Sequence, residues 1–167
     1  MDKAVFLLDC IANVILSWSI AVVNQAMRHC APLPMYSSKD DILNEYIETI
    51  FLAFYDELTK RGIHHYWEVV QLYFDFWEQR ESVILLFKKH ELLPVLMESS
   101  RNHADQIFSA VRSPETAAAF SPLLPYMLAY AVGGMHNMLV TWITSGKSVP
   151  SNVLIQNMKS GLQSPDI

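Results

Sequence analysis

The cysteines and histidines are the residues of this chain with the widest chemical repertoire, and their spacing argues against a metal site. Cys10 and Cys30 are the only cysteines, and they show neither the C-x-x-C spacing nor the second pair that a zinc site or a disulfide framework needs. His64 and His65 are adjacent, so their side chains would point in different directions on a helix. Three other histidines have no histidine or acidic residue four positions later: His90, His103 and His136. We therefore expect no bound metal, and a reducing cytoplasm as the compartment.

Sequence motifs for catalysis and nucleotide binding are missing. The chain contains no G-x-S-x-G, no Walker loop, no G-x-G-x-x-G and no H-E-x-x-H. Cys30 follows His29, but no third residue nearby would orient the pair, so we expect an ordinary thiol. We expect no catalytic residue, no cofactor and no enzymatic activity.

The elements that would position these side chains are all helical. The chain has 167 residues, of which 51% are apolar and only 5 are glycine, as in a helical globule. Its formal charge of −5 provides no overall basic field for nucleic acid, so any DNA contact would have to be local.

The clearest predicted helix begins after Ser38. Ser38 and Asp41 have the spacing of a capping box, and acidic residues in the first turn favour the positive end of the helix dipole. Gly62 provides the C-terminal stop. Between them the apolar residues recur at helical spacing: Ile42, Leu43, Tyr46, Ile47, Ile50, Phe51, Phe54 and Leu58.

Further helices are predicted downstream, and no segment alternates as a strand would. We expect helices over residues 64–77, 81–89 and 92–111, another from Ser121-Pro122 to Ser145-Gly146, and a last one to residue 162 that Ser151 caps. The sequence therefore predicts an all-α protein.

The helix that contains Gly133 and Gly134 predicts a close helix contact. Glycine inside a helix costs about 1 kcal/mol against alanine, and close helix approach is the usual compensation. Residues that share this face mix small, amide and aromatic side chains, which suits a homodimer interface. The interface candidates are Tyr130, Gly133, Gly134, Asn137, Met138, Thr141 and Trp142. Packing inside one monomer is the alternative for the same residues.

Between Tyr36 and Leu162, three stretches occur in a suggestive order: SSKDDILNEYIETIF, YFDFWEQRESVILLFKKHELLPVLME and AYAVGGMHNMLVTWITSG. The first resembles the helix that follows the DNA-binding helix-turn-helix in tetracycline-repressor (TetR) family regulators. The other two resemble the ligand-binding and dimerisation part of one branch of that family. The resemblance implies a TetR-like helical bundle, with a DNA-binding head in residues 1–37 and a ligand-binding and dimerisation domain in residues 38–167.

The N-terminal region departs from the family pattern. Family members usually carry a Thr-Phe-Tyr-x-x-Phe run on the DNA-reading helix, whereas RHCAPLPM stands here, with Pro32 and Pro34. The head is therefore interpreted as degenerate or truncated, with weak DNA binding. Its candidate DNA contacts are Arg28, His29, Tyr36 and Lys39. The alternative is that all four are ordinary surface or capping residues.

The resemblance also implies a ligand site among the aromatic residues in the middle of the chain. Pockets for small apolar or aromatic ligands are built from such side chains and a few polar groups. The candidates are Phe54, Tyr73, Phe74, Trp77, Phe87, His103 and Phe108. A well-packed aromatic core without a ligand is the alternative.

Two further interpretations stay open. The apolar segment of residues 4–27 is long enough to anchor a membrane-associated helical protein, but its polar residues, such as Asp9, Asn13 and Asn24, argue against a membrane role. The chain could also dimerise and bind ligand without binding DNA. We expect a cytoplasmic TetR-like regulator as the first interpretation.

Overall fold

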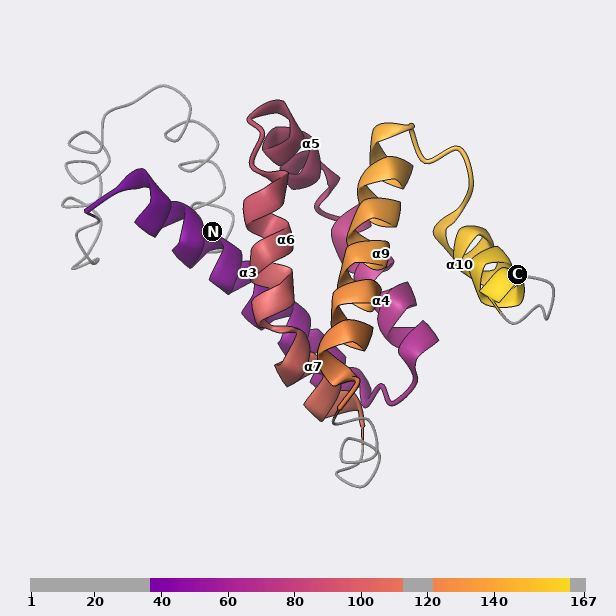
Figure 1. Ribbon diagram of the computed structural model, residues 1–167. Helices are drawn as coiled ribbons and strands as arrows, with labels where there is room; N and C mark the ends of the chain where they lie inside the picture. Colours follow the sequence, from indigo (N-terminus) through magenta and orange to yellow (C-terminus); the bar gives the residue numbers. More distant parts are fainter. Residues whose placement is uncertain (1–36, 113–121, 163–167) are drawn as a thin grey trace. The chain divides into compact units, whose positions relative to one another are not determined.

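The computed structural model describes residues 37–112 and 122–162, and within these ranges the chain forms seven helices and no strand (Figure 1). This confirms the predicted all-α class. The helices are α3 (Lys39–Arg61), α4 (Tyr66–Glu78), α5 (Glu81–Lys89), α6 (Leu93–Asn102), α7 (Ala104–Val111), α9 (Leu124–Thr144) and α10 (Ser151–Leu162).

Helix α3 begins with the predicted capping box. The hydroxyl oxygen of Ser38 accepts a hydrogen bond of 3.1 Å from the backbone N–H of Asp41. The Asp41 carboxylate in turn accepts bonds from the backbone N–H groups of Ser38 at 2.9 Å and Ser37 at 3.1 Å. These contacts satisfy amides that have no partner within a helix, so they fix where α3 starts.

The predicted apolar stripe of α3 is buried along its whole length. All eight predicted residues are at most 7% exposed: Ile42, Leu43, Tyr46, Ile47, Ile50, Phe51, Phe54 and Leu58. The chain divides into two compact units, residues 1–52 and residues 53–167, so α3 begins in the first unit and ends in the second. The predicted domain boundary at residues 37/38 stays a prediction.

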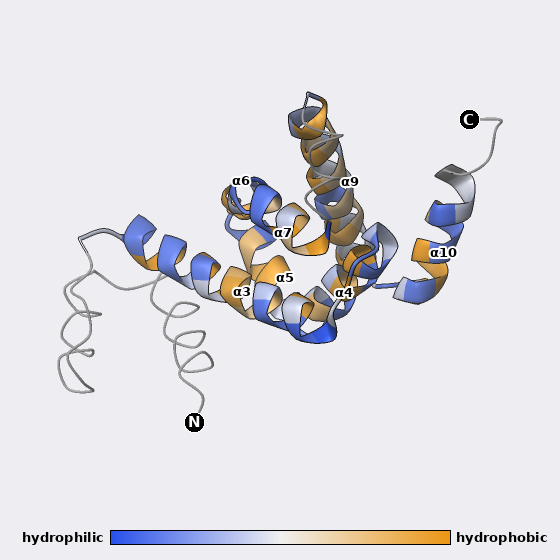
Figure 2. Ribbon diagram, turned by 90° about the horizontal axis from the view of Figure 1, so that it is seen from below, coloured by the Kyte–Doolittle hydropathy of each residue, from blue (hydrophilic) through white to orange (hydrophobic). Residues whose placement is uncertain are grey.

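Helix α9 is the central helix of the second unit. It contacts α4, α5, α6 and α7, and Figure 2 shows hydrophobic residues along much of its length. The core around it includes Phe74, Phe87, Leu96 and Leu139, each at most 2% exposed. Since one helix packs against four others, α9 necessarily has a broad buried side.

The prediction of one helix over residues 92–111 was wrong. The structure has two helices there, α6 and α7, which meet at His103. Ser99, Ser100 and Asn102 precede the break, and such residues favour helices weakly because their side chains compete for backbone hydrogen bonds. The Nδ1 atom of His103 lies 2.8 Å from the carbonyl oxygen of Ser99, which also accepts a bond of 3.2 Å from the backbone N–H of His103.

Helices α5 and α9 end with the same pair of hydrogen bonds around a left-handed residue. After α9, Gly146 has φ 82° and its N–H bonds the carbonyl of Ile143, while the N–H of Lys147 bonds the carbonyl of Trp142. This is a Schellman motif at the predicted stop. The same pattern ends α5, but there Glu91 has the positive φ, at 59°.

The last helix starts one residue differently from the prediction. The carbonyl of Pro150, rather than that of Ser151, accepts the first helical bond, from the N–H of Leu154 at 3.0 Å. Ser151 is therefore the first residue of α10 and not its cap. Its hydroxyl instead accepts a hydrogen bond of 3.3 Å from the side-chain amide of Gln71 in α4.

Candidate functional site

Six aromatic side chains from α3, α4 and α9 form one buried cluster: Phe54, Tyr73, Phe74, Phe76, Trp77 and Trp142. The Phe54 ring meets those of Tyr73 at 5.9 Å and Phe76 at 5.4 Å, both edge to face, which is a favoured geometry for aromatic pairs. Trp77 extends the cluster along α4, at 6.3 Å from Tyr73. Four of the seven predicted ligand candidates belong to this cluster: Phe54, Tyr73, Phe74 and Trp77.

Helix α9 contributes to the same cluster through Trp142. Its ring lies 5.4 Å from that of Phe74, and its indole N–H donates a hydrogen bond of 2.6 Å to the carbonyl of Val149. Trp142 is 5% exposed, so the structure places this predicted interface residue inside the chain.

The other ligand candidates lie outside this set of rings in the described residues. Phe87 of α5 is buried, whereas His103 and Phe108 are half-buried. Phe76 is a cluster member that the prediction omitted, although it lies three residues after Tyr73 on one helical face.

Three buried polar groups accompany the aromatic residues. Burial raises the pKa of the Tyr73 hydroxyl, and hydrogen bonds with Ser100 and Trp77 act in the opposite direction. Ser100 is buried, and its hydroxyl donates to the carbonyl of Leu96 at 2.9 Å. His136 of α9 is 3% exposed, and its Nδ1 atom has no hydrogen-bond partner among the described residues.

His136 is the polar group with the least compensation. Burial lowers its pKa from its ordinary value because desolvation disfavours the charged imidazole. A buried ring nitrogen without a partner costs free energy, so a group that formed a hydrogen bond with Nδ1 would be stabilised there. Sequence reasoning treated His136 only as a poor metal ligand, since nothing local signals its burial.

The opposite side of α9 carries an exposed, uncharged surface. It comprises Leu123, just before the helix, and Tyr126, Met127, Tyr130, Gly134, Asn137 and Thr141, all exposed. We call these residues the α9 stripe. Tyr126 and Tyr130 are 75% and 71% exposed, and no side chain within α9 carries an aspartate, glutamate, lysine or arginine charge.

The spacing within the α9 stripe is that of a helix–helix seam. Leaving out Tyr126, its members are separated alternately by four and three residues, which is the heptad pattern of helices that pack along their length. Gly134 lies within this seam, and a Cβ atom added to it would meet no atom of the described residues within 4 Å. Packing among the described residues of one monomer therefore does not explain why a glycine stands here.

The predicted interface residues divide between two environments. Tyr130, Gly134, Asn137 and Thr141 belong to the α9 stripe, and Trp142 is buried. Gly133 and Met138 are half-buried at the edges of the stripe. A Cβ atom on Gly133 would lie 4.0 Å from the terminal methyl of Met97 in α6, an ordinary contact.

Most of the predicted DNA contacts lie outside the described residues. These are Arg28, His29 and Tyr36, whereas Lys39 is the exposed first residue of α3. Residues 4–27, the candidate membrane anchor, also lie outside. No helix in the described ranges combines the length and apolar character needed to cross a bilayer, and no cluster of metal-binding side chains occurs in them.

Comparison with protein-family models, with curated proteins and with solved structures finds no match to this chain.

Proposed function

We propose that the chain is a TetR-like transcription regulator of the cytoplasm that acts as a homodimer, responds to a small apolar or aromatic ligand and binds DNA weakly. The observation that carries this proposal is the α9 stripe, an uncharged surface on the central helix with helix-pairing spacing. Aromatic and Met side chains are enriched at subunit interfaces and charges are depleted at their centres, which supports a second copy as the partner.

The aromatic cluster supports the ligand part of the proposal. It lies on the side of α9 opposite the α9 stripe, where Trp142 of α9 packs on Phe74 of α4. A ligand that altered this packing would change how α9 is presented to the second subunit. In the family resemblance, such a change alters the spacing of two DNA-binding heads, which is a population shift between competent and incompetent dimers. The proposal includes no catalytic step.

Replacement of Gly134 by leucine tests the dimer. In the isolated chain, Gly134 is exposed and a Cβ there meets no described atom within 4 Å, and leucine favours a helix over glycine by about 1 kcal/mol, so Gly134→Leu should not unfold the protein. In a dimer that associates through the α9 stripe, the same side chain would separate the two α9 helices and weaken association at least about tenfold. Analytical ultracentrifugation over a dilution series measures both the mass and the dissociation constant.

Ala129 provides the matched control, because it is exposed on α9 but lies outside the stripe. Ala129→Leu should leave the dissociation constant unchanged. A wild-type chain that is monomeric at micromolar concentration, or a Gly134→Leu dimer as tight as the wild type, would refute the proposed interface.

A further inference from the structure

Helix α10 is attached to the rest of its unit with little apolar burial. It packs mainly on α4, and among residues 151–161 only Ile155 is buried, at 4% exposure. Val153 and Met158 are exposed on the same helix, at 44% and 39%. A helix of 12 residues is marginal in isolation, so α10 depends on its contacts with the rest of the unit.

Polar contacts add to this packing, and they lie at the N-terminal end of α10. The Trp142 indole bonds the carbonyl of Val149 in the connecting loop, and Gln71 bonds the hydroxyl of Ser151. The same Gln71 amide donates to the Asp75 carboxylate at 2.8 Å, which orients it along α4. These bonds hold the start of α10 beside α4.

Lys147 connects this loop to the corner between α4 and α5. Its ammonium lies 2.5 Å from the carboxylate of Glu81 at the start of α5 and 3.5 Å from that of Glu78 at the end of α4. The side chain of Lys147 is 30% exposed, and its ammonium lies 6.0 Å from the centre of the Trp142 ring. One charge therefore bridges the α4–α5 corner and the loop that leads to α10.

The backbone conformation of Lys147 is linked to these ion pairs. Lys147 follows the left-handed Gly146 and has a positive φ itself, at 53°, where a non-glycine residue is strained. Two consecutive left-handed residues reverse the chain after α9 and direct the Lys147 side chain to the two glutamates. The loop geometry and the ion pairs thus support each other.

We propose that Lys147, Glu78 and Glu81 form an ionic clasp that controls whether α10 is docked on α4. With the clasp closed, Ile155 is buried and α10 packs on α4. When the charges are screened or removed, α10 detaches while the helices around α9 stay folded. The clasp is a conformational device that responds to ionic strength and to charge-changing modification of Lys147.

Hydrogen exchange of the full chain, followed by mass spectrometry, tests the clasp. We expect Lys147→Met to accelerate exchange in residues 151–162 by about threefold or more, because a bridging charge contributes modestly but α10 has few other contacts. Methionine has an unbranched side chain of similar length to that of lysine and is also a non-glycine residue, so the backbone strain at this position is unchanged. Glu81→Gln removes the nearer carboxylate and should have a smaller effect in the same direction.

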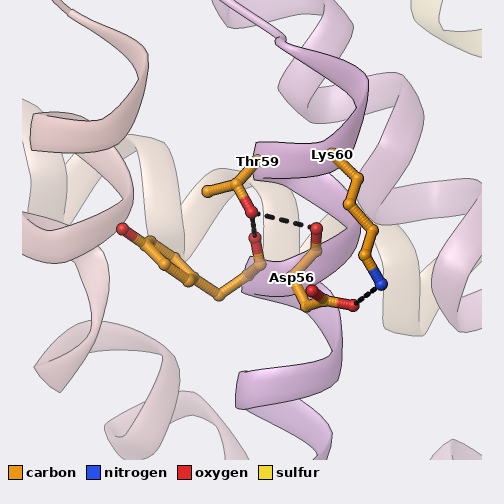
Figure 3. A network of polar contacts seen from close by, with 4 residues as sticks. Asp56, Thr59 and Lys60 are labelled. Carbon is orange, nitrogen blue, oxygen red and sulfur yellow. Dashed lines mark hydrogen bonds and ion pairs between the residues drawn. The ribbon is translucent and has the colours of Figure 1, made fainter.

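The surface pair of Lys60 and Asp56 provides the control. It lies on α3 with an N–O distance of 2.6 Å, and its side chains are 73% and 58% exposed (Figure 3). Lys60→Met should leave exchange in α10 unchanged. In the wild type, raising sodium chloride from about 0.05 M to about 1 M should reproduce part of the Lys147→Met effect.

Unchanged exchange of α10 in both Lys147→Met and Glu81→Gln would overturn the proposal. So would an equal rise in exchange across α4, α9 and α10, because that result would show general destabilisation rather than release of one helix. Faster exchange confined to α10 supports the clasp, whether or not the protein is a dimeric regulator.

Discussion

His136 is the residue through which we expect pH to act on the helical core. It lies on the buried side of α9 without a partner for Nδ1 in the described residues, whereas the neighbouring Asn137 is exposed and bonds the carbonyl of Gly133 at 2.9 Å. Two adjacent polar residues thus lie in different environments, one buried and one exposed, because successive helical positions point about 100° apart.

The first prediction concerns the stability of the wild type in acid. The folded state holds the pKa of His136 below its ordinary value of 6.5, so the unfolded chain binds the proton more readily. The contribution of His136 to the free energy of unfolding is complete above about pH 6.5 and decreases as the pH falls toward the lowered pKa. Below that pKa the contribution stays constant.

Urea denaturation at a series of pH values measures this dependence. His136→Leu should remove part of the decrease in unfolding free energy between neutral and mildly acidic pH. His64→Gln, a substitution of an exposed histidine, is measured in parallel as the control. Identical pH profiles for the wild type and His136→Leu would contradict the assignment.

Helix ends are the element-scale feature that local residue types control most directly. Gly62 and Glu91 both follow a helix with φ near 60°, yet only the first is a glycine. Glycine adopts this conformation readily, whereas other L-residues bring Cβ too close to a neighbouring carbonyl oxygen. Of these two helix ends, the one at Gly62 has a residue type that suits its backbone conformation, and the one at Glu91 does not.

The second prediction compares these two ends. Glu91→Gly should raise the free energy of unfolding by about 1 kcal/mol, because it removes the strain from an exposed position. Gly62→Ala should lower it by about the same amount, since a Cβ there meets nothing within 4 Å and only the backbone conformation opposes it. The prediction is contradicted if both substitutions shift the urea midpoint in the same direction, or if Glu91→Gly lowers it and Gly62→Ala raises it. Either result would show that side-chain contacts outweigh the backbone conformation at these ends.

At the scale of the whole molecule, charge and the N-terminal sequence bear on DNA binding. The chain has a formal charge of −5, and its proposed head supplies few cations. Phosphate contacts provide most nonspecific affinity, and each one lost reduces the salt dependence by nearly one unit of slope. A dimer of this chain would therefore bind DNA with a shallow salt dependence.

The third prediction is weak or absent specific binding to the DNA that flanks the gene. Fluorescence anisotropy with that DNA, at two salt concentrations and with excess competitor, provides the measurement. Specific regulators reach dissociation constants of about 10⁻⁸ to 10⁻¹¹ M, and this chain should not. Tight, competitor-resistant binding would show that Pro32 and Pro34 are accommodated in a working recognition helix.

What the sequence determined by itself is the local part of the structure. The Ser38–Asp41 capping box, the buried stripe of α3 and the glycine stop after α9 depend on residues within a few positions of one another, and each was predictable. The break at His103 was not, because several weak helix formers only lower the stability of a helix, and packing decides whether it divides.

Only the tertiary structure decided which face of α9 is covered. Helical spacing groups Tyr130, Gly134 and Trp142 together, yet Trp142 is buried against α4 while Tyr130 and Gly134 are exposed. Periodicity shows which residues share a side of a helix, but not whether the neighbouring element extends over all of it. Here the neighbours of α9 reach Trp142 and leave the α9 stripe exposed, because burial depends on contacts between residues far apart in the chain.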